Sequence, residues 1–220
     1  YNEYLKSVFP NSEVKDFLYH GGNENIQEFS KEKLGETTKA DSAKLGFFFS
    51  NNKDVSLTYI ERYRYEAIGE LKVKVDEFNQ TYNNENYAVK SRPIKNKQLY
   101  TVLLDIRNPL VVNYREDRKD GGRFYVDSVS EAIKNNNDAA ILEDVIDLNT
   151  DTLTKNYDKF IGNDYVVFES NQIHILGSNK DVKGFEDFAK NNSDLDTILD
   201  QGNIKGALDF LDGMKLDPNT

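Results

Sequence analysis

Residues 16–22, DFLYHGG, form a short apolar and aromatic run that ends in two glycines. Such a run is typical of a buried strand that enters a tight loop. The pattern predicts that His20 lies at the end of this strand, immediately before Gly21. An imidazole is therefore expected beside a backbone position that carries no side chain.

A second apolar block, GFFFS at residues 46–50, predicts another buried strand. The Ser-Asn-Asn sequence at residues 50–52 offers N-cap side chains for a helix that begins near Lys53. We expect Tyr59 about two turns into that helix. Ser56 precedes Tyr59 by one helical turn and faces a similar direction. The two side chains are therefore expected to line one pocket.

The rest of the chain predicts further helices and strands. Residues 60–97 are charged and rich in tyrosine, and we interpret them as an extended helix followed by an asparagine-rich loop at 79–86. Residues 164–168 and 172–176 are interpreted as two strands joined by a turn at 169–171. The other expected elements are a helix at 1–9, a loop at 23–45, strands at 99–106, 110–112 and 139–146, a helix at 126–134, and helical segments within 181–214.

Several short strands with few helices between them, and no alternating β-α-β rhythm, predict an α+β fold with mainly antiparallel pairing. The glycines have neither the spacing of the Rossmann G-x-G-x-x-G motif nor that of the P-loop. Any bound nucleotide would therefore be held by a different arrangement. We expect one domain at residues 1–177 and a small C-terminal helical extension or linker at residues 178–220.

The composition excludes several classes of site. The formal net charge is −10, which repels phosphate backbones, so a protein is favoured over nucleic acid as a partner. The chain has no cysteine, which excludes thiolate nucleophiles, and with His20 and His174 as its two histidines we expect no metal site. No apolar run reaches the roughly 20 residues needed to span a bilayer, and the N-terminus has no signal-peptide pattern, so no membrane partner is expected.

Three blocks in order resemble a known family. They are LYHG at 18–21, the GFFFS block that runs on to Tyr59, and NDYVVF at 163–168, which runs on to Gln172. They resemble the diphtheria-toxin and poly(ADP-ribose)-polymerase branch of the ADP-ribosyltransferases, and the order of elements is similar to that of the domains found in phage and mobile-element polyvalent proteins. The resemblance spans residues 14–177 and implies split antiparallel β-sheets with flanking helices.

The resemblance implies NAD⁺ as the substrate and gives several residues a role in binding it. His20 would hydrogen-bond a ribose hydroxyl of the adenosine half, and the backbone of Gly21 would hold the nicotinamide amide. Tyr59 would stack on the nicotinamide ring, while Phe48 would form the opposite wall. Ser56 would add a hydroxyl to the amide.

Asp164 occupies the position of the catalytic glutamate of the family. Its side chain is shorter by one methylene, about 1.5 Å of bond length. Glu169 and Gln172 are therefore alternative third members of the site.

Several of these residues also have an interpretation without function. The His20 ring could be satisfied at the end of a strand, Phe48 could belong to the core, and Asp164 could be a surface acid at the start of a strand. These alternatives stay open at the level of sequence.

The resemblance favours a mono-ADP-ribosyltransferase that modifies a host protein and releases nicotinamide. A silent binding or structural module with the same fold, and an NAD⁺ glycohydrolase, are the alternatives. The expected setting is a cytoplasm, for a phage-encoded or delivered effector or toxin. Because the chain begins at Tyr1, we also expect it to be a fragment. Its oligomeric state is left open.

Overall fold

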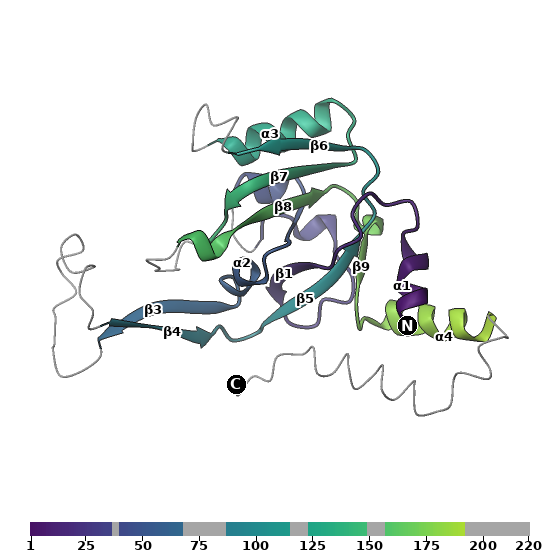
Figure 1. The fold of residues 1–220 in the computed structure, drawn as a ribbon, viewed down its shortest axis with the longest axis horizontal. Helices are drawn as coiled ribbons and strands as arrows, with labels where there is room; N and C mark the ends of the chain where they lie inside the picture. The colour runs from purple at the N-terminus through teal and green to yellow at the C-terminus, as the bar shows by residue number, and fades with distance from the viewer. Residues whose placement is uncertain (37–39, 68–86, 115–122, 149–156, 192–220) are drawn as a thin grey trace.

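A seven-stranded sheet forms the centre of the protein (Figure 1). The computed structural model describes residues 1–36, 40–67, 87–114, 123–148 and 157–191. The strand order is β6-β7-β8-β2-β1-β5-β9, and a separate sheet pairs β3 with β4. The strands are β1 Leu18–Asn23, β2 Phe47–Ser50, β3 Glu61–Ala67, β4 Tyr87–Pro93, β5 Lys97–Leu104, β6 Pro109–Asn113, β7 Ala139–Ile146, β8 Ile161–Val167 and β9 Ile173–Ile175. The helices are α1 Asn2–Val8, α2 Lys53–Leu57, α3 Phe124–Lys134 and α4 Asn179–Asn191, with 3₁₀ turns η1 Lys31–Lys33, η2 Ser42–Lys44, η3 Tyr157–Phe160 and η4 Ser170–Gln172.

Antiparallel pairing predominates in the large sheet, which confirms the α+β prediction. The edge pair β6 and β7 is parallel, and α3 lies between these two strands in the chain. α3 buries Val129 and Ala132 in one apolar cluster with Leu142 of β7. These elements form a β-α-β unit at this edge. It is the one such unit among the described residues, so the chain has no alternating β-α-β rhythm, as predicted.

The sheet has a seam between β1 and β2. These strands share a single register pair, Tyr19 with Ser50, whereas β1 has six pairs with β5 and β2 has four with β8. The expected split sheets correspond to the two halves on either side of this seam. α2 follows directly after β2 at this seam.

Side chains of β2 alternate between two apolar clusters. Phe47 and Phe49 are buried with Leu18 and Val102 on one face of the sheet. Phe48 is half-buried and packs against the cluster that includes Val166 on the other face. This alternation follows from the two-residue period of a strand.

Two predictions around the seam need correction. β1 continues through the glycines to Asn23, because Gly21 pairs with Leu99 and Gly22 with Gln98, so His20 lies inside the strand and not at its end. α2 ends at Leu57, because the following backbone N–H groups bond three residues back in a tight turn. Tyr59 therefore follows the helix and does not lie two turns into it.

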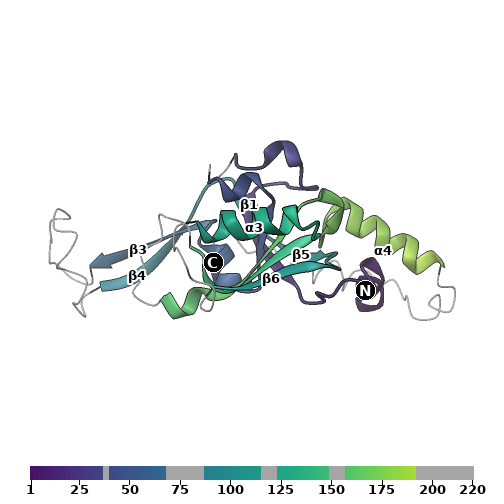
Figure 2. The same cartoon turned by 90° about the horizontal axis from the view of Figure 1, so that it is seen from above.

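The extended helix predicted for residues 60–97 is wrong wherever the chain is described. β3 and β4 form an antiparallel ribbon with a register from Glu61 opposite Pro93 to Ala67 opposite Tyr87. Charged and aromatic residues alternate along β3 with the period of a strand. The ribbon extends away from the large sheet (Figures 1 and 2). The predicted loop at 79–86 lies outside the described residues.

β8 and β9 form the two strands predicted near the end of the sheet, but they do not pair with each other. β8 lies between β7 and β2, whereas β9 pairs with β5 at the opposite edge. The chain therefore crosses from one half of the sheet to the other through the η4 turn.

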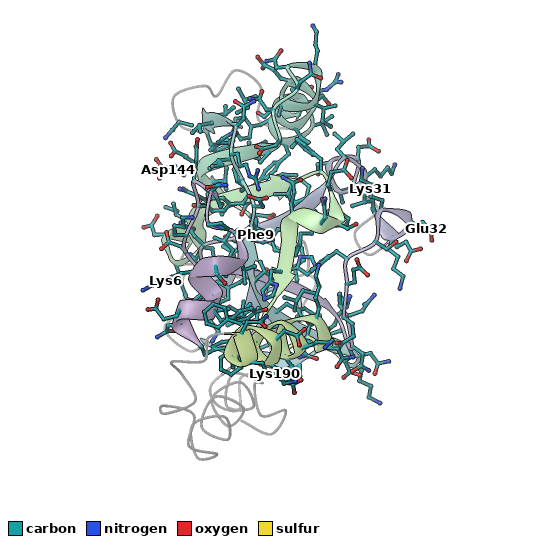
Figure 3. The ribbon with its side chains drawn as sticks, turned by 90° about the vertical axis from the view of Figure 1, so that its right-hand side faces the viewer. Lys6, Phe9, Lys31, Glu32, Asp144 and Lys190 are labelled. Atoms are coloured by element: carbon teal, nitrogen blue, oxygen red, sulfur yellow. The ribbon has the colours of Figure 1, made fainter. Side chains whose placement is uncertain are left out.

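α4 packs against the sheet and against α1. Phe185 and Phe188 of α4 pack against the cluster formed by Tyr4, Leu5 and Leu103. Figure 3 shows α1 and α4 together at one end of the molecule. The predicted helical segments beyond Asn191 lie outside the described residues.

Candidate functional site

His20 joins the two strands at the seam. Its Nδ1 lies 2.8 Å from the carbonyl oxygen of Phe48. A carbonyl oxygen can only accept, so Nδ1 carries the proton and donates. Burial lowers the pKa of His20, the bond to Phe48 opposes this shift, and the charge of Lys97 adds to it. The ring is therefore neutral at pH 7, with an Nε2 lone pair that can accept a hydrogen bond.

Gly21 allows α2 to approach the backbone of β1. A Cβ at this position would lie 2.4 Å from the carbonyl oxygen of Ser56 and 2.8 Å from Cβ of Tyr59. The hydroxyl of Ser56 donates to the carbonyl oxygen of Tyr19 at 3.0 Å. The absence of a side chain at Gly21 thus allows Ser56 and Tyr59 to lie against the backbone of β1 at the residue that follows His20, whose own ring packs against Phe29 and Phe49.

Tyr59 is half-buried, and its hydroxyl is hydrogen-bonded to a carboxylate. The hydroxyl donates to Oδ1 of Asp147 at 2.8 Å. Asp147 follows directly after β7. Burial raises the pKa of Tyr59 well above its usual value, and the charges of Asp147 and Asp164 act in the same direction.

Asp164 is 2% exposed, so it is not the surface acid that one sequence interpretation allowed. Its position on β8 lies opposite Ser50 of β2 and Leu142 of β7. The hydroxyl of Tyr125, from the first turn of α3, donates to its Oδ2 at 3.1 Å. The buried strand β8 thus holds a carboxylate between the two neighbouring strands.

Two tyrosines and two carboxylates therefore form one cluster, which we call the Tyr-Asp cluster: Tyr59, Tyr125, Asp147 and Asp164. Burial raises the pKa of Asp164 well above its usual value, Asp147 raises it further, and hydrogen bonds from Tyr125 and Ser50 oppose the shift. Burial also raises the pKa of Asp147, against the hydrogen bond from Tyr59. Each carboxylate disfavours charge on the other, so the pair retains a proton more readily than an isolated carboxyl does.

The pKa values of the Tyr-Asp cluster are shifted by burial and by its own tyrosines, carboxylates and hydrogen bonds, and no cation among the residues that the structure describes acts on them. A cation placed here would stabilise both carboxylates in their charged form. The arrangement can therefore favour a positively charged group or a developing positive charge.

The model of the family "ADP-ribosyltransferase in polyvalent proteins" matches residues 15–183, well over half of the chain. This protein belongs to that ADP-ribosyltransferase family. No curated protein and no solved structure matches the chain. The family match includes β1, β2 and β8, which carry His20, Phe48 and Asp164.

In this ADP-ribosyltransferase domain Phe48 contributes its backbone to the site through the bond to His20. Its ring lies 6.2 Å from that of Tyr125, measured between centroids. Phe48 is thus half-buried beside the Tyr-Asp cluster and outside the fully buried core.

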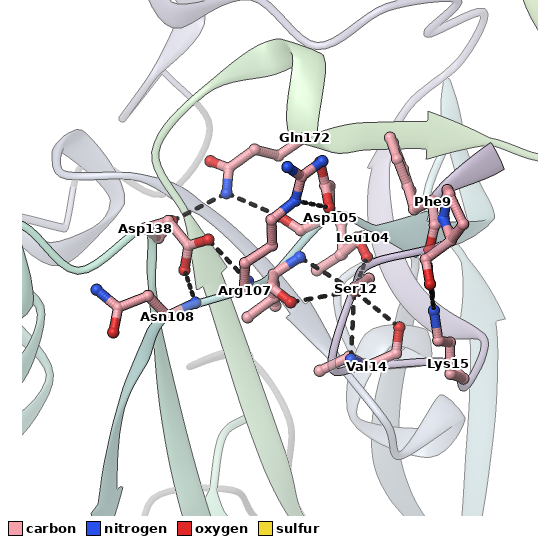
Figure 4. A network of polar contacts seen from close by, with 12 residues as sticks. Phe9, Ser12, Val14, Lys15, Leu104, Asp105, Arg107, Asn108, Asp138 and Gln172 are labelled. Atoms are coloured by element: carbon pink, nitrogen blue, oxygen red, sulfur yellow. Dashed lines mark hydrogen bonds and ion pairs between the residues drawn. The ribbon is translucent and has the colours of Figure 1, made fainter.

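The other two candidates for the third site residue lie outside the Tyr-Asp cluster. Glu169 is exposed and pairs with Lys31. The amide of Gln172 donates to the carbonyl oxygens of Asp105 and Asp138 at 2.9 and 3.0 Å (Figure 4). Its Oε1 accepts from two backbone N–H groups of the turn between β8 and β9. Both polar ends of Gln172 are therefore engaged in holding loops together.

Tyr125 and Asp147 are members of the cluster that the sequence patterns did not predict. Asp147 stands at the end of an apolar strand, and Tyr125 at the start of an amphipathic helix. Each carries a polar side chain next to the end of a predicted strand or helix, and this position is the sequence feature that could have identified it as a candidate site residue. Nothing in the sequence pairs them with Tyr59 or Asp164.

Among the described residues of this ADP-ribosyltransferase domain there is no group of three or more His, Asp or Glu side chains that could hold a metal ion. Helices in the same part of the chain are too short or too polar to cross a membrane.

Proposed function

We propose that this domain is a mono-ADP-ribosyltransferase that transfers ADP-ribose from NAD⁺ to a protein acceptor. The bond between ribose C1′ and the nicotinamide nitrogen breaks, and its electron pair returns to the pyridine ring. An acceptor atom forms the new bond to C1′ and loses its proton. Because the leaving group is cationic before the bond breaks and neutral afterwards, no general acid is needed.

The observation that carries the proposal is that Asp164 lies buried in the same cluster as Tyr59, although the two are far apart in the chain. Tyr59 would stack on nicotinamide and Phe48 would form the opposite wall. Asp164 would stabilise the positive charge that develops on the ribose, since charge stabilisation in a preorganised site lowers the barrier.

His20 supports the same assignment. Its Nε2 can accept a hydrogen bond from a ribose hydroxyl, while Nδ1 is already bonded to Phe48. The Ser56 hydroxyl donates to Tyr19 but keeps lone pairs for the nicotinamide amide, and Gly21 supplies backbone groups beside it.

The negative charge of the chain favours a protein acceptor over nucleic acid. We also propose that the domain acts in a cytoplasm, as a phage-encoded or delivered effector, which is what the resemblance to the domains of polyvalent proteins implies.

The test is to incubate the purified chain with labelled NAD⁺ and a protein mixture, and to follow both nicotinamide release and label transfer. We expect His20→Ala, Tyr59→Ala and Asp164→Asn each to lower release. Glu169→Gln removes the same charge as Asp164→Asn and should leave release unchanged. Consumption of NAD⁺ without labelled protein would indicate a glycohydrolase, and wild type that neither binds nor consumes NAD⁺ would indicate a silent module.

A further inference from the structure

The hydrogen bond from Tyr59 to Asp147 is formed at an electrostatic free-energy cost, because it places a second carboxylate in the Tyr-Asp cluster. Asp147 lies beside Asp164, and burial disfavours the charge on both carboxyls. A half-buried phenol could donate to water or to a neutral carbonyl without placing a second carboxylate there. The fold therefore keeps Asp147 in an electrostatically unfavourable place.

A β-bulge determines where Asp147 lies. Leu142 of β7 pairs with Asp164, and Val145 pairs with Gly162, so residues 143 and 144 face the single residue 163 of β8. Asp144 has a left-handed backbone, with φ at 55°, and its N–H donates to Oδ1 of Asn163 at 3.2 Å. Such bulges re-aim the residues that follow them and are frequent beside active sites.

A cationic ligand would remove the electrostatic cost. The nicotinamide ring of NAD⁺ is positively charged, and no cation within the described ranges of the chain stabilises the carboxylates of the Tyr-Asp cluster. The placement of Asp147 and Asp164 beside the Tyr59 ring is therefore electrostatically more favourable in the complex with NAD⁺ than in the free protein.

We infer that Asp147 is a positioning residue that holds the Tyr59 ring, through the bond to its hydroxyl, in the orientation in which it stacks on nicotinamide. The inference rests on the proposed function. It assigns to the chain a second carboxylate, one that acts on the substrate through Tyr59, in addition to Asp164.

The inference predicts a pattern among variants. Asp147→Ala removes the acceptor, so the Kd for NAD⁺ should rise about tenfold, the equivalent of one hydrogen bond to a charged group. Asp147→Asn keeps an oxygen that accepts from Tyr59, so it should recover part of the affinity. Tyr59→Phe keeps the ring and loses the bond, so it should resemble Asp147→Ala. In the Tyr59→Phe background, Asp147→Ala should have little further effect.

The experiment is calorimetric titration of the full chain with NAD⁺ for these four variants, with KM and kcat for nicotinamide release. Asp187→Ala, which removes an exposed carboxylate of α4, is the control. Circular dichroism melting checks that each variant is folded. A rise in Kd and KM that exceeds the fall in kcat, with the expected non-additivity, supports the role.

Three outcomes overturn the inference, and the last can be told apart from the first two. Additive losses in the double variant, or an unchanged Kd in folded Asp147→Ala, would remove the positioning role while leaving the proposed function intact. Wild type that fails to bind NAD⁺ would overturn both.

Discussion

His20 donates from Nδ1 to the carbonyl oxygen of Phe48 at 2.8 Å, and this bond crosses the seam where β1 and β2 share one register pair. Nδ1 thus joins the two halves of the sheet. In the function proposed above, the other nitrogen, Nε2, accepts a hydrogen bond from a ribose hydroxyl of NAD⁺.

Substitutions at His20 should separate these two roles. The amide nitrogen of His20→Asn occupies nearly the position of Nδ1, so this variant should keep the bond to Phe48 and most of its melting temperature. It should nevertheless lose about tenfold or more in NAD⁺ affinity, because Nε2 is gone. His20→Ala should lose both. Melting curves and calorimetry on the two variants provide the comparison, and equal NAD⁺ affinity in His20→Asn and wild type would refute the role of Nε2.

Gly21→Ala should be costly because the added Cβ meets the carbonyl oxygen of Ser56 at 2.4 Å, and backbone cannot move aside easily. We expect a loss of about 1–3 kcal/mol in the free energy of unfolding, together with weaker NAD⁺ binding as Tyr59 shifts. Gly22→Ala is the matched comparison, since its Cβ meets the ends of the His20 and Ile26 side chains. Urea denaturation should show the larger loss for Gly21→Ala; the reverse order would contradict the packing argument.

The buried carboxyl of Asp164 should make stability depend on pH. Burial and Asp147 raise the pKa of Asp164 in the folded state above the value of about 3.9 in the unfolded chain. Its contribution is therefore fully present below about pH 4 and is lost as the pH rises through the folded-state pKa. Asp164→Asn should remove this loss, so the variant should gain stability relative to wild type between pH 4.5 and pH 8.

The measurement is the melting temperature of both proteins across that range, without ligand. Asp187→Asn makes the same change in net charge at an exposed position and should run parallel to wild type. A constant difference in melting temperature between Asp164→Asn and wild type at every pH would show that folding does not raise the pKa of Asp164.

Asp181 should be among the costliest positions in the chain. Its carboxylate is fully buried and accepts from Tyr1, from the backbone N–H of Gly177 at 2.8 Å and from His174, whose Nε2 lies 2.6 Å away. Asp181→Ala leaves these donors unpaired and should cost about 3–5 kcal/mol in the free energy of unfolding. Asp187→Ala breaks an exposed pair and should cost at most about 0.5 kcal/mol. Similar denaturation midpoints for the two variants would show that α4 is not bound to the sheet in solution.

The sequence by itself determined the elements whose side-chain pattern is local. Apolar runs gave β2, β5, β7 and β8 close to their observed positions, because a buried strand needs a short continuous apolar stretch. The three-block resemblance also identified the family and implied His20, Tyr59 and Asp164 as candidate site residues. Residues of β3 also alternate in the sequence. The alternation is between charged and aromatic residues, and it was not interpreted as a strand.

Only the tertiary structure decided which polar groups meet. Asp147 reaches Tyr59 because a bulge in β7 shifts the residues that follow it, and Tyr125 reaches Asp164 because α3 crosses between β6 and β7. Glu169 and Gln172 stand as close to Asp164 in sequence as any candidate, yet the chain leaves the cluster at the end of β8. Hydrogen-bond partners depend on distances across the sheet, and these distances follow from register and packing, which no local pattern records.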